Sequence, residues 1–227
     1  MERDYPDAEV GAIRAAYDLA MRLFTSRFRG SGKPFLAHAV GTAGILTLLR
    51  APAHVVAAGL LHAAYTHGDF GDGRAGISDG RRAEVRGVVG NDTEVLIARY
   101  TSWAWNETAV LALRGRVASL RPEDGTVLLM RLANELEDHL DLGIAYCRDA
   151  EHRRGLIRSW LHICVDLAEE LGQPDLAGWL ARAFRGNLSR LVHPELMADQ
   201  SISYTLNPAS CRPRWLVRLR RVLARRS

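Results

Sequence analysis

Apolar residues recur every three or four positions along most of the chain, which is the spacing of one face of an α-helix. The first such stretch runs from 7 to 29, with Asp7 as its expected N-cap and "GSGKP" as its stop. A second begins at Pro34, a favourable residue for a first helical turn. A third starts at "APAHVV" and ends near Ala64. This pattern predicts an all-α protein.

The rest of the chain continues the helical pattern after a Gly/Asp-rich stretch, "HGDFGDGRAGISDG". Helices are expected near 80–89, 92–103, 107–119, 123–142, 151–171 and 174–185. Residues 186–210 have no sustained period and are expected to form loop with short helical pieces. Residues 215–226 form an expected amphipathic basic helix. The division predicted is a helical domain over 1–185, followed over 186–227 by an irregular segment and that C-terminal helix.

Composition narrows the class of protein. With 227 residues, 48% of them hydrophobic, the chain is long enough to bury one substantial core. It has no apolar run of the roughly 18 residues that a membrane span needs, and "MERDYPDAEV" lacks the apolar region of a secretory signal. Three cysteines without a CxxC pair fit a reducing compartment. We therefore expect a cytoplasmic protein.

The net charge of +4 comes almost entirely from arginine, and Lys33 is the only lysine. Much of the positive charge lies in the tail, "CRPRWLVRLRRVLARRS". Aromatic residues do not alternate with these arginines, so nucleic-acid binding is not expected. The C-terminal helix is expected to dock on the body of the protein, with binding to a partner or an anionic membrane as the alternative.

Two histidines lie on apolar helix faces. His38 occurs in "KPFLAHAV" and His62 in "GLLHAAYTH", on consecutive helices joined by a short turn. A buried imidazole needs a hydrogen-bond partner or a metal ion. Either histidine alone fits a satisfied core residue, but the pair predicts a shared site, because antiparallel neighbours bring such positions together.

Further polar residues extend this candidate site. His67 and Asp69 lie in the Gly-rich loop, where an imidazole beside a carboxylate is typical of an oriented base. Asn134 and Asp138 stand four residues apart and share a helix face. The other acids of "NELEDHLD" are expected on the solvated side of that helix. We expect Lys33, Tyr65, Asn134, Asp138 and Trp103 to contact substrate, although core packing is the alternative for Trp103.

Three motifs in a fixed order support a family resemblance. The stretches "KPFLAHAV", "GLLHAAYTH" and "RLANELED" resemble those of the HD-domain superfamily, above all the guanosine tetraphosphate hydrolase domain of stringent-response enzymes and their small stand-alone relatives. The resemblance covers about residues 10–145. It implies an HD-domain-like helical bundle with a metal-dependent pyrophosphohydrolase site. In the family, the early His, a His-Asp pair and a late Asp hold a divalent metal.

This sequence departs from the family at most of those positions. His38 and His62 match two metal ligands, but the paired Asp is Ala63 and the late Asp is Asn134. The family's acidic catalytic pair falls on Thr66 and His67, and its late Asn falls on Asp138. Mn²⁺ and Mg²⁺ prefer carboxylate ligands, so we expect no cofactor. The alternative is a weakly held divalent metal on His38 and His62, with Asp69 or Asp138 completing the shell.

Three functions follow from this interpretation. The first is a metal-independent enzyme of specialised metabolism, with His38, His62, His67 and Asp69 as catalytic residues for acid/base chemistry on a small molecule. The second is a catalytically inactive module that binds a nucleotide or phosphometabolite. The third is a metal-dependent pyrophosphohydrolase of guanosine tetraphosphate-like nucleotides. In the second, phosphate would meet arginines near the pocket mouth: Arg29, Arg81, Arg82 and Arg131. The expected partner is a small molecule, and homo-oligomers are compatible with the sequence.

Overall fold

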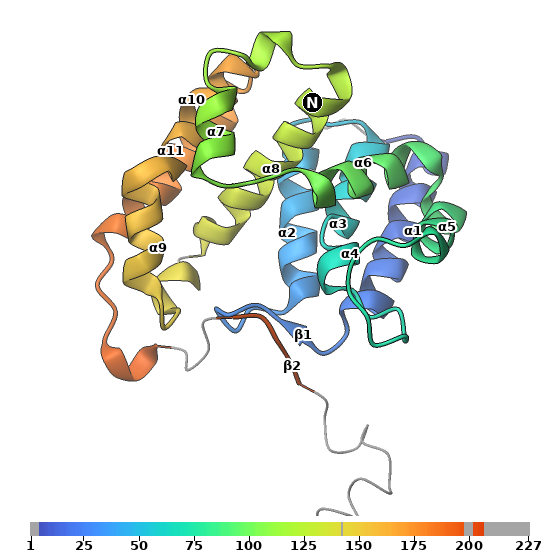
Figure 1. Ribbon diagram of the computed structural model, residues 1–227, viewed down its shortest axis with the longest axis horizontal. Helices are drawn as coiled ribbons and strands as arrows, with labels where there is room; N and C mark the ends of the chain where they lie inside the picture. Colours follow the sequence, from blue (N-terminus) through green and yellow to red (C-terminus); the bar gives the residue numbers. More distant parts are fainter. Residues whose placement is uncertain (1–4, 142, 198–201, 207–227) are drawn as a thin grey trace, which may run out of the picture.

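The computed structural model describes residues 5–141, 143–197 and 202–206 (Figure 1). Its helices are α1 (Asp7–Phe24), α2 (Phe35–Leu48), α3 (Ala53–Leu61), α4 (Ala64–His67), α5 (Asp79–Val89), α6 (Asn91–Ser102), α7 (Glu107–Leu113), α8 (Pro122–Leu140), α9 (Ala150–Leu156), α10 (Ile163–Glu170) and α11 (Pro174–Ser189). Short 3-10 turns form η1 (Val117–Ser119), η2 (Gly143–Tyr146) and η4 (Pro194–Leu196), and η3 (Ile157–Leu161) is a π-helical turn. The two strands, β1 (Arg27–Phe28) and β2 (Tyr204–Thr205), are only two residues long. The all-α class predicted from the sequence is confirmed.

Helix α8 runs through the middle of the bundle, between α2 on one side and α11 on the other (Figure 1). Pro122 begins it, with Glu123 and Asp124 in the first turn, where acidic side chains favour the helix dipole. Its apolar face, from Val127 to Leu136, is fully buried. Because this burial fixes α8 against both neighbours, the polar residues that follow Ala133 are held in the interior.

The first helix is shorter than its spacing predicts. It ends at Phe24 rather than near Arg29, because the chain turns at Ser26, which has a positive φ of 63°. Strand β1 then pairs antiparallel with β2, Phe28 opposite Tyr204, and their rings stack with centroids 5.4 Å apart. Helical spacing does not reveal this pairing, because its partner lies far away in the sequence.

Other boundaries differ in the same local way. The stretch 107–119 breaks after α7, where Gly115 adopts a positive φ of 69°. The stretch 151–171 divides into α9, η3 and α10, and α11 continues to Ser189, beyond the predicted end at 185. Asp7 is the first residue of α1 instead of its N-cap. The predicted helix over 215–226 lies outside the described residues. Within those residues, no helix has the length and apolar character to cross a membrane.

Candidate functional site

The two core histidines meet at the interface of α2 and α3. His38 projects from α2 and is completely buried, and His62 follows the last residue of α3. Their Nε2 atoms are 3.2 Å apart, and the rings meet edge to face with centroids 5.0 Å apart. The structure thus brings together the two histidines that the sequence assigned to a shared site.

The hydrogen-bond partners assign the protons on this pair. His62 Nδ1 donates to the carbonyl of Gly59 over 2.7 Å, which leaves its Nε2 as an acceptor. Burial, followed by the charge of His38, lowers the pKa of His62 to about 3, so this ring is neutral at pH 7. His38 Nε2 must therefore donate to His62, and it also lies 3.0 Å from Oδ1 of Asn134.

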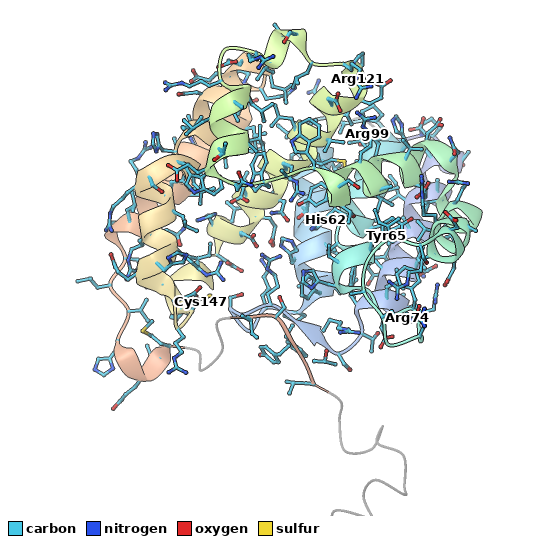
Figure 2. The ribbon with its side chains drawn as sticks, in the orientation of Figure 1. His62, Tyr65, Arg74, Arg99, Arg121 and Cys147 are labelled. Atoms are coloured by element: carbon cyan, nitrogen blue, oxygen red, sulfur yellow. The ribbon has the colours of Figure 1, made fainter. Side chains whose placement is uncertain are left out.

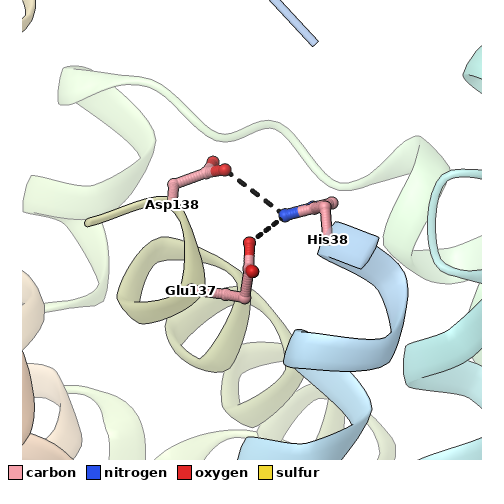
Figure 3. Close-up of side chains that lie close together, drawn as sticks. All are labelled: His38, Glu137 and Asp138. Atoms are coloured by element: carbon pink, nitrogen blue, oxygen red, sulfur yellow. Dashed lines mark hydrogen bonds and ion pairs between the residues drawn. The ribbon is translucent and has the colours of Figure 1, made fainter. Parts of the chain in front are cut away.

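The other side of the His38 ring faces two carboxylates of α8 (Figure 3). Nδ1 contacts a carboxylate oxygen of Glu137 and lies 3.4 Å from Oδ1 of Asp138. Gly41 makes room for this contact, because a Cβ there would lie only 2.7 Å from Glu137 Cγ. His62, His38 and Glu137 therefore form one continuous chain of hydrogen bonds.

Two cations from the segment before α2 neutralise these carboxylates. Lys33 donates to Glu137 and to Asp141 Oδ2, the latter over 2.9 Å. Arg29 donates to Asp138 Oδ2 over 2.7 Å. Burial opposes ionisation of Asp138, but the nearby charges of Arg29 and His38 hold the pKa of its carboxyl below the usual value. Asp138 is therefore an ionised, paired carboxylate.

The prediction that the acids of α8 lie on its solvated side is wrong for Glu135 and Glu137, which are both buried. For Glu135, the one signal of this placement was its position next to Asn134, which directly follows the apolar run "LLMRLA". Spacing alone missed it, because the partners Lys33 and Trp105 reach these acids only in the folded chain.

A cavity of about 300 Å³ lies against the histidine pair. Two imidazoles lie in its wall, the exposed His67 and the buried His62. The wall also includes two arginines and two carboxyl groups: Arg29, Arg131, Glu135 and Asp138. The remaining polar residues of the wall are Thr66, Tyr100, Thr101 and Asn134. A chamber with both cations and bases in its wall suits an anionic small molecule. We refer to it as the histidine cavity.

Glu135 is the acidic group of this cavity whose protonation is most altered. Trp105 donates its indole N–H to Oε1 over 2.8 Å. Burial, reinforced by the negative charge of Asp138, raises the pKa of Glu135 to about 7. Sequence analysis assigned no catalytic role to Glu135, yet this carboxyl can both hold and release a proton near neutral pH.

His67, at the end of α4, is exposed and lies in the wall of two adjoining hollows. Its ring packs against Phe35 with centroids 4.6 Å apart, and the described residues offer its nitrogens no hydrogen bond. Partial loss of water around the ring, then the charges of Arg29 and Arg27, lower the pKa of His67. It is therefore a neutral base within reach of a bound molecule.

Other residues predicted for the site lie elsewhere. Asp69 is outside the wall of the cavity: its carboxylate accepts from the backbone N–H of Gly71 and pairs with Arg27. Tyr65 is buried with its hydroxyl on Glu94, 2.8 Å away. Trp103 contributes a carbonyl that Arg131 binds over 2.9 Å, while its ring is absent from the wall.

The four candidate phosphate-binding arginines fall into two groups, those that line the histidine cavity and those that do not; Figure 2 labels His62, which lies in the cavity wall. Arg29 and Arg131 line the histidine cavity. Arg81 instead binds Asp72 and the carbonyls of Arg74 and Gly76, so it braces the Gly-rich loop. Arg82 pairs with the buried Glu94. Lys33 lines a neighbouring hollow of about 430 Å³, which shares Arg29, His67 and Asp138 with the histidine cavity.

One group of side chains in the site has the ligand atoms that a divalent metal could use. Ligand atoms of His38, Glu137 and Asp138 lie within 4.8 Å of one another, the one such group among the described residues. Lys33 and Arg29 already occupy those two carboxylates. On the opposite side of the His38 ring, Nε2 meets only uncharged groups, His62 Nε2 and Asn134 Oδ1. Ala63 stands where the resemblance would place a carboxylate. These residues do not fit a Mn²⁺ or Mg²⁺ site, although they allow weak binding of a metal.

A family described as a domain of unknown function (DUF6817) matches residues 21–104. The match includes His38, His62 and His67 and ends before α8. Among curated proteins, a GTP pyrophosphokinase rsh of Brucella suis biovar 1 (strain 1330) is 28% identical over 181 residues, which is 78% of this chain. The chain spans only 22% of the length of that relative.

The fold itself has a solved counterpart. A metazoan ortholog of SpoT, described as hydrolysing ppGpp and playing a role in starvation responses, matches with a TM-score of 0.54 and 17% identity. The match covers 81% of this chain and 98% of the other. The likeness to stringent-response hydrolase domains, which the ordered motifs predicted, is therefore confirmed in the fold.

Proposed function

We propose that this protein is an enzyme that uses histidine acid/base chemistry, without a bound metal, on an anionic small molecule. The observation that carries the proposal is the composition of the histidine cavity. Two neutral imidazoles, His62 and His67, face a space that also contains Arg29 and Arg131. The carboxylates that would charge a metal site are replaced by Ala63 and Asn134, and Glu137 and Asp138 are already paired with Lys33 and Arg29.

The groups take different roles in this proposal. His67 has accessible nitrogens and acts as the base toward the substrate. His62 is the outer end of the chain through His38 to Glu137, and that carboxylate stabilises a proton on the imidazole pair. Asp69, paired with Arg27, holds the loop that follows His67. Isomerisation, cyclisation, elimination and hydrolysis all need such a base and acid.

The cations favour a phosphate or carboxylate group on the substrate. Arg29 keeps one guanidinium edge on Asp138 and presents the rest to the cavity. Arg131 is fixed by the carbonyls of Tyr100 and Trp103 and stacks on the Tyr100 ring at 3.7 Å. Two cations held in place in this way bind an anion with little loss of side-chain entropy.

The likeness to a ppGpp hydrolase supports two other functions for the same site. One is a binding module for a nucleotide, which the adjoining hollow with Lys33 and Arg153 would extend. The other is a metal-dependent pyrophosphohydrolase, for which the group of His38, Glu137 and Asp138 would have to release Arg29 and Lys33. The binding module requires no turnover, and the pyrophosphohydrolase requires a bound metal.

The test is turnover in the presence of EDTA. A set of phosphorylated metabolites, including guanosine tetraphosphate, is incubated with the protein and followed by ¹H and ³¹P NMR. We expect at least one to be converted in EDTA, with a loss of about 10²-fold or more in His67→Ala. His54→Ala, which changes an exposed histidine of α3, is the matched control.

Each alternative gives a different result. Conversion of guanosine tetraphosphate only after addition of Mn²⁺ would establish the metal-dependent hydrolase. A thermal shift with guanosine tetraphosphate in EDTA, without conversion of any compound, would establish the binding module. Equal turnover in His67→Ala and His54→Ala would overturn the role of His67.

A further inference from the structure

A second chamber of about 190 Å³ lies directly behind the histidine cavity. The two spaces share Glu135 and Asp138, so they adjoin at this part of α8. On the far side, Trp105 precedes α7, Leu156 ends α9 and Trp160 lies in η3. The chamber is therefore built by the half of the molecule that is most distant in sequence from the histidines.

The chamber has an apolar side and a polar side. Trp105, Trp160, Leu156, Leu161 and Ile144 form the apolar side, and Glu135, Asp138, His139 and Arg153 form the polar side. Two charges of the polar side are compensated elsewhere, since Asp138 pairs with Arg29 over 2.7 Å and Arg153 with Asp149 over 3.0 Å. The aromatic and aliphatic side binds rings and hydrocarbon groups better than ions.

The place of Trp160 is unusual for a helix. It lies in the π-helical turn Ile157–Leu161, where one extra residue is inserted between α9 and α10. Such insertions occur frequently at functional sites. Trp160 is 8% exposed, and it forms part of the same chamber wall as Glu135.

We infer that this chamber is the subsite for an aromatic or apolar group of the substrate, so that the enzyme acts on a molecule with a ring next to an anionic group. The inference rests on the proposed function, because the anionic group occupies the histidine cavity. The size agrees, since a protein cavity of about 150 Å³ accommodates benzene.

Glu135 lies where the two parts of such a molecule would join. Trp105 holds Oε1, and the described residues place no hydrogen bond on the second oxygen. A hydroxyl or amine on the ring would meet that oxygen at the boundary of the two spaces. The chamber therefore selects for ring size, and Glu135 for a polar substituent on the ring.

The probes are phenol, inorganic phosphate and phenyl phosphate, with binding measured by calorimetry and by ¹H–¹⁵N NMR of the indole groups. We expect phenyl phosphate to bind about tenfold or more tightly than phosphate, because the ring leaves water. Phenol should shift the indole signals of Trp105 and Trp160 and leave those of Trp103 and Trp179 unchanged. These signals test the chamber in the unmodified protein.

A variant that fills the chamber completes the test. Leu156→Trp should abolish phenol binding and the advantage of phenyl phosphate, while phosphate binding stays the same. Leu48→Trp, at a residue of α2 that is 70% exposed, is the control. Absence of phenol shifts at Trp105 and Trp160 would overturn the inference. Phenol binding without phosphate binding would instead support the chamber and count against the anionic part of the proposed function.

Discussion

Two buried glutamates of this protein, Glu94 of α6 and Glu135 of α8, differ in the number of donors that surround them. Within the described part of the chain, Glu94 accepts from Tyr65, Arg82 and Arg86, while Glu135 accepts from Trp105 alone. Burial favours the neutral form of Glu94, yet its donors hold the pKa below the usual value. The pKa of Glu135 is raised to about 7. The donor set, more than burial, decides whether such a carboxyl is structural or chemically active.

The largest expected effect comes from removing Glu94. Glu94→Ala leaves Arg82, Arg86 and the Tyr65 hydroxyl without their acceptor, and we expect a loss of about 3–5 kcal/mol in the free energy of unfolding at pH 7. Urea denaturation measures it. Asp18→Ala, which breaks an exposed pair with Arg14, should cost less than about 1 kcal/mol. Similar losses of unfolding free energy in both variants would show that the Glu94 cluster stabilises the fold no more than an exposed ion pair does.

The opposite behaviour is expected of Glu135. Its folded pKa of about 7 exceeds the ordinary 4.5, so its stabilising contribution is complete below 4.5 and lost as the pH rises through 7. Glu135→Gln keeps an acceptor for Trp105 and avoids the buried charge. We therefore expect a gain of about 1–3 kcal/mol at pH 8 and little change at pH 5. Denaturation at both pH values tests this, and an equal effect at each would refute it.

A smaller effect on stability is expected at Tyr65, and it tests the substrate-binding role predicted for this residue. Tyr65→Phe removes one hydrogen bond to Glu94 and should cost about 1 kcal/mol of stability. Because the hydroxyl points to Glu94, phosphate binding measured by calorimetry should not change. A weaker affinity for phosphate at unchanged stability would restore Tyr65 to the binding site.

The smallest effect on stability is expected at Asp69. Asp69→Asn weakens an exposed pair with Arg27, in which the side-chain atoms are 3.4 Å apart, and should cost less than about 0.5 kcal/mol. Turnover should fall less than in His67→Ala, because Asp69 acts only by holding the loop that follows His67. A loss as large as that of His67→Ala would instead give the Asp69 carboxylate the catalytic role that the sequence predicted.

Helical spacing was sufficient for the fold and for the first half of the site. It placed His38 and His62 on buried faces, and the ordered motifs led to Asn134 and Asp138. It failed where partners come from distant segments. Glu137 is buried because Lys33 and His38 reach it, and Tyr65 faces away from His62 because Glu94 satisfies its hydroxyl. Periodicity describes one helix at a time and contains no information on such partners.

The strand pair β1–β2 has a consequence for how a ligand leaves the site. Residues Ile202 and Ser203, just before β2, line the same hollow as Arg29, which directly follows β1. Among the described residues, two residue pairs, the stacked rings of Phe28 and Tyr204, and hydrogen bonds from Arg27 to Thr205 Oγ1 and from Leu206 N–H to the Ser26 carbonyl hold this wall. So short a ladder opens by local unfolding at a small fraction of the global free energy. On the proposed function, the residence time of a bound molecule would depend on the local opening of these two strands, while the histidines on the helical core keep their geometry.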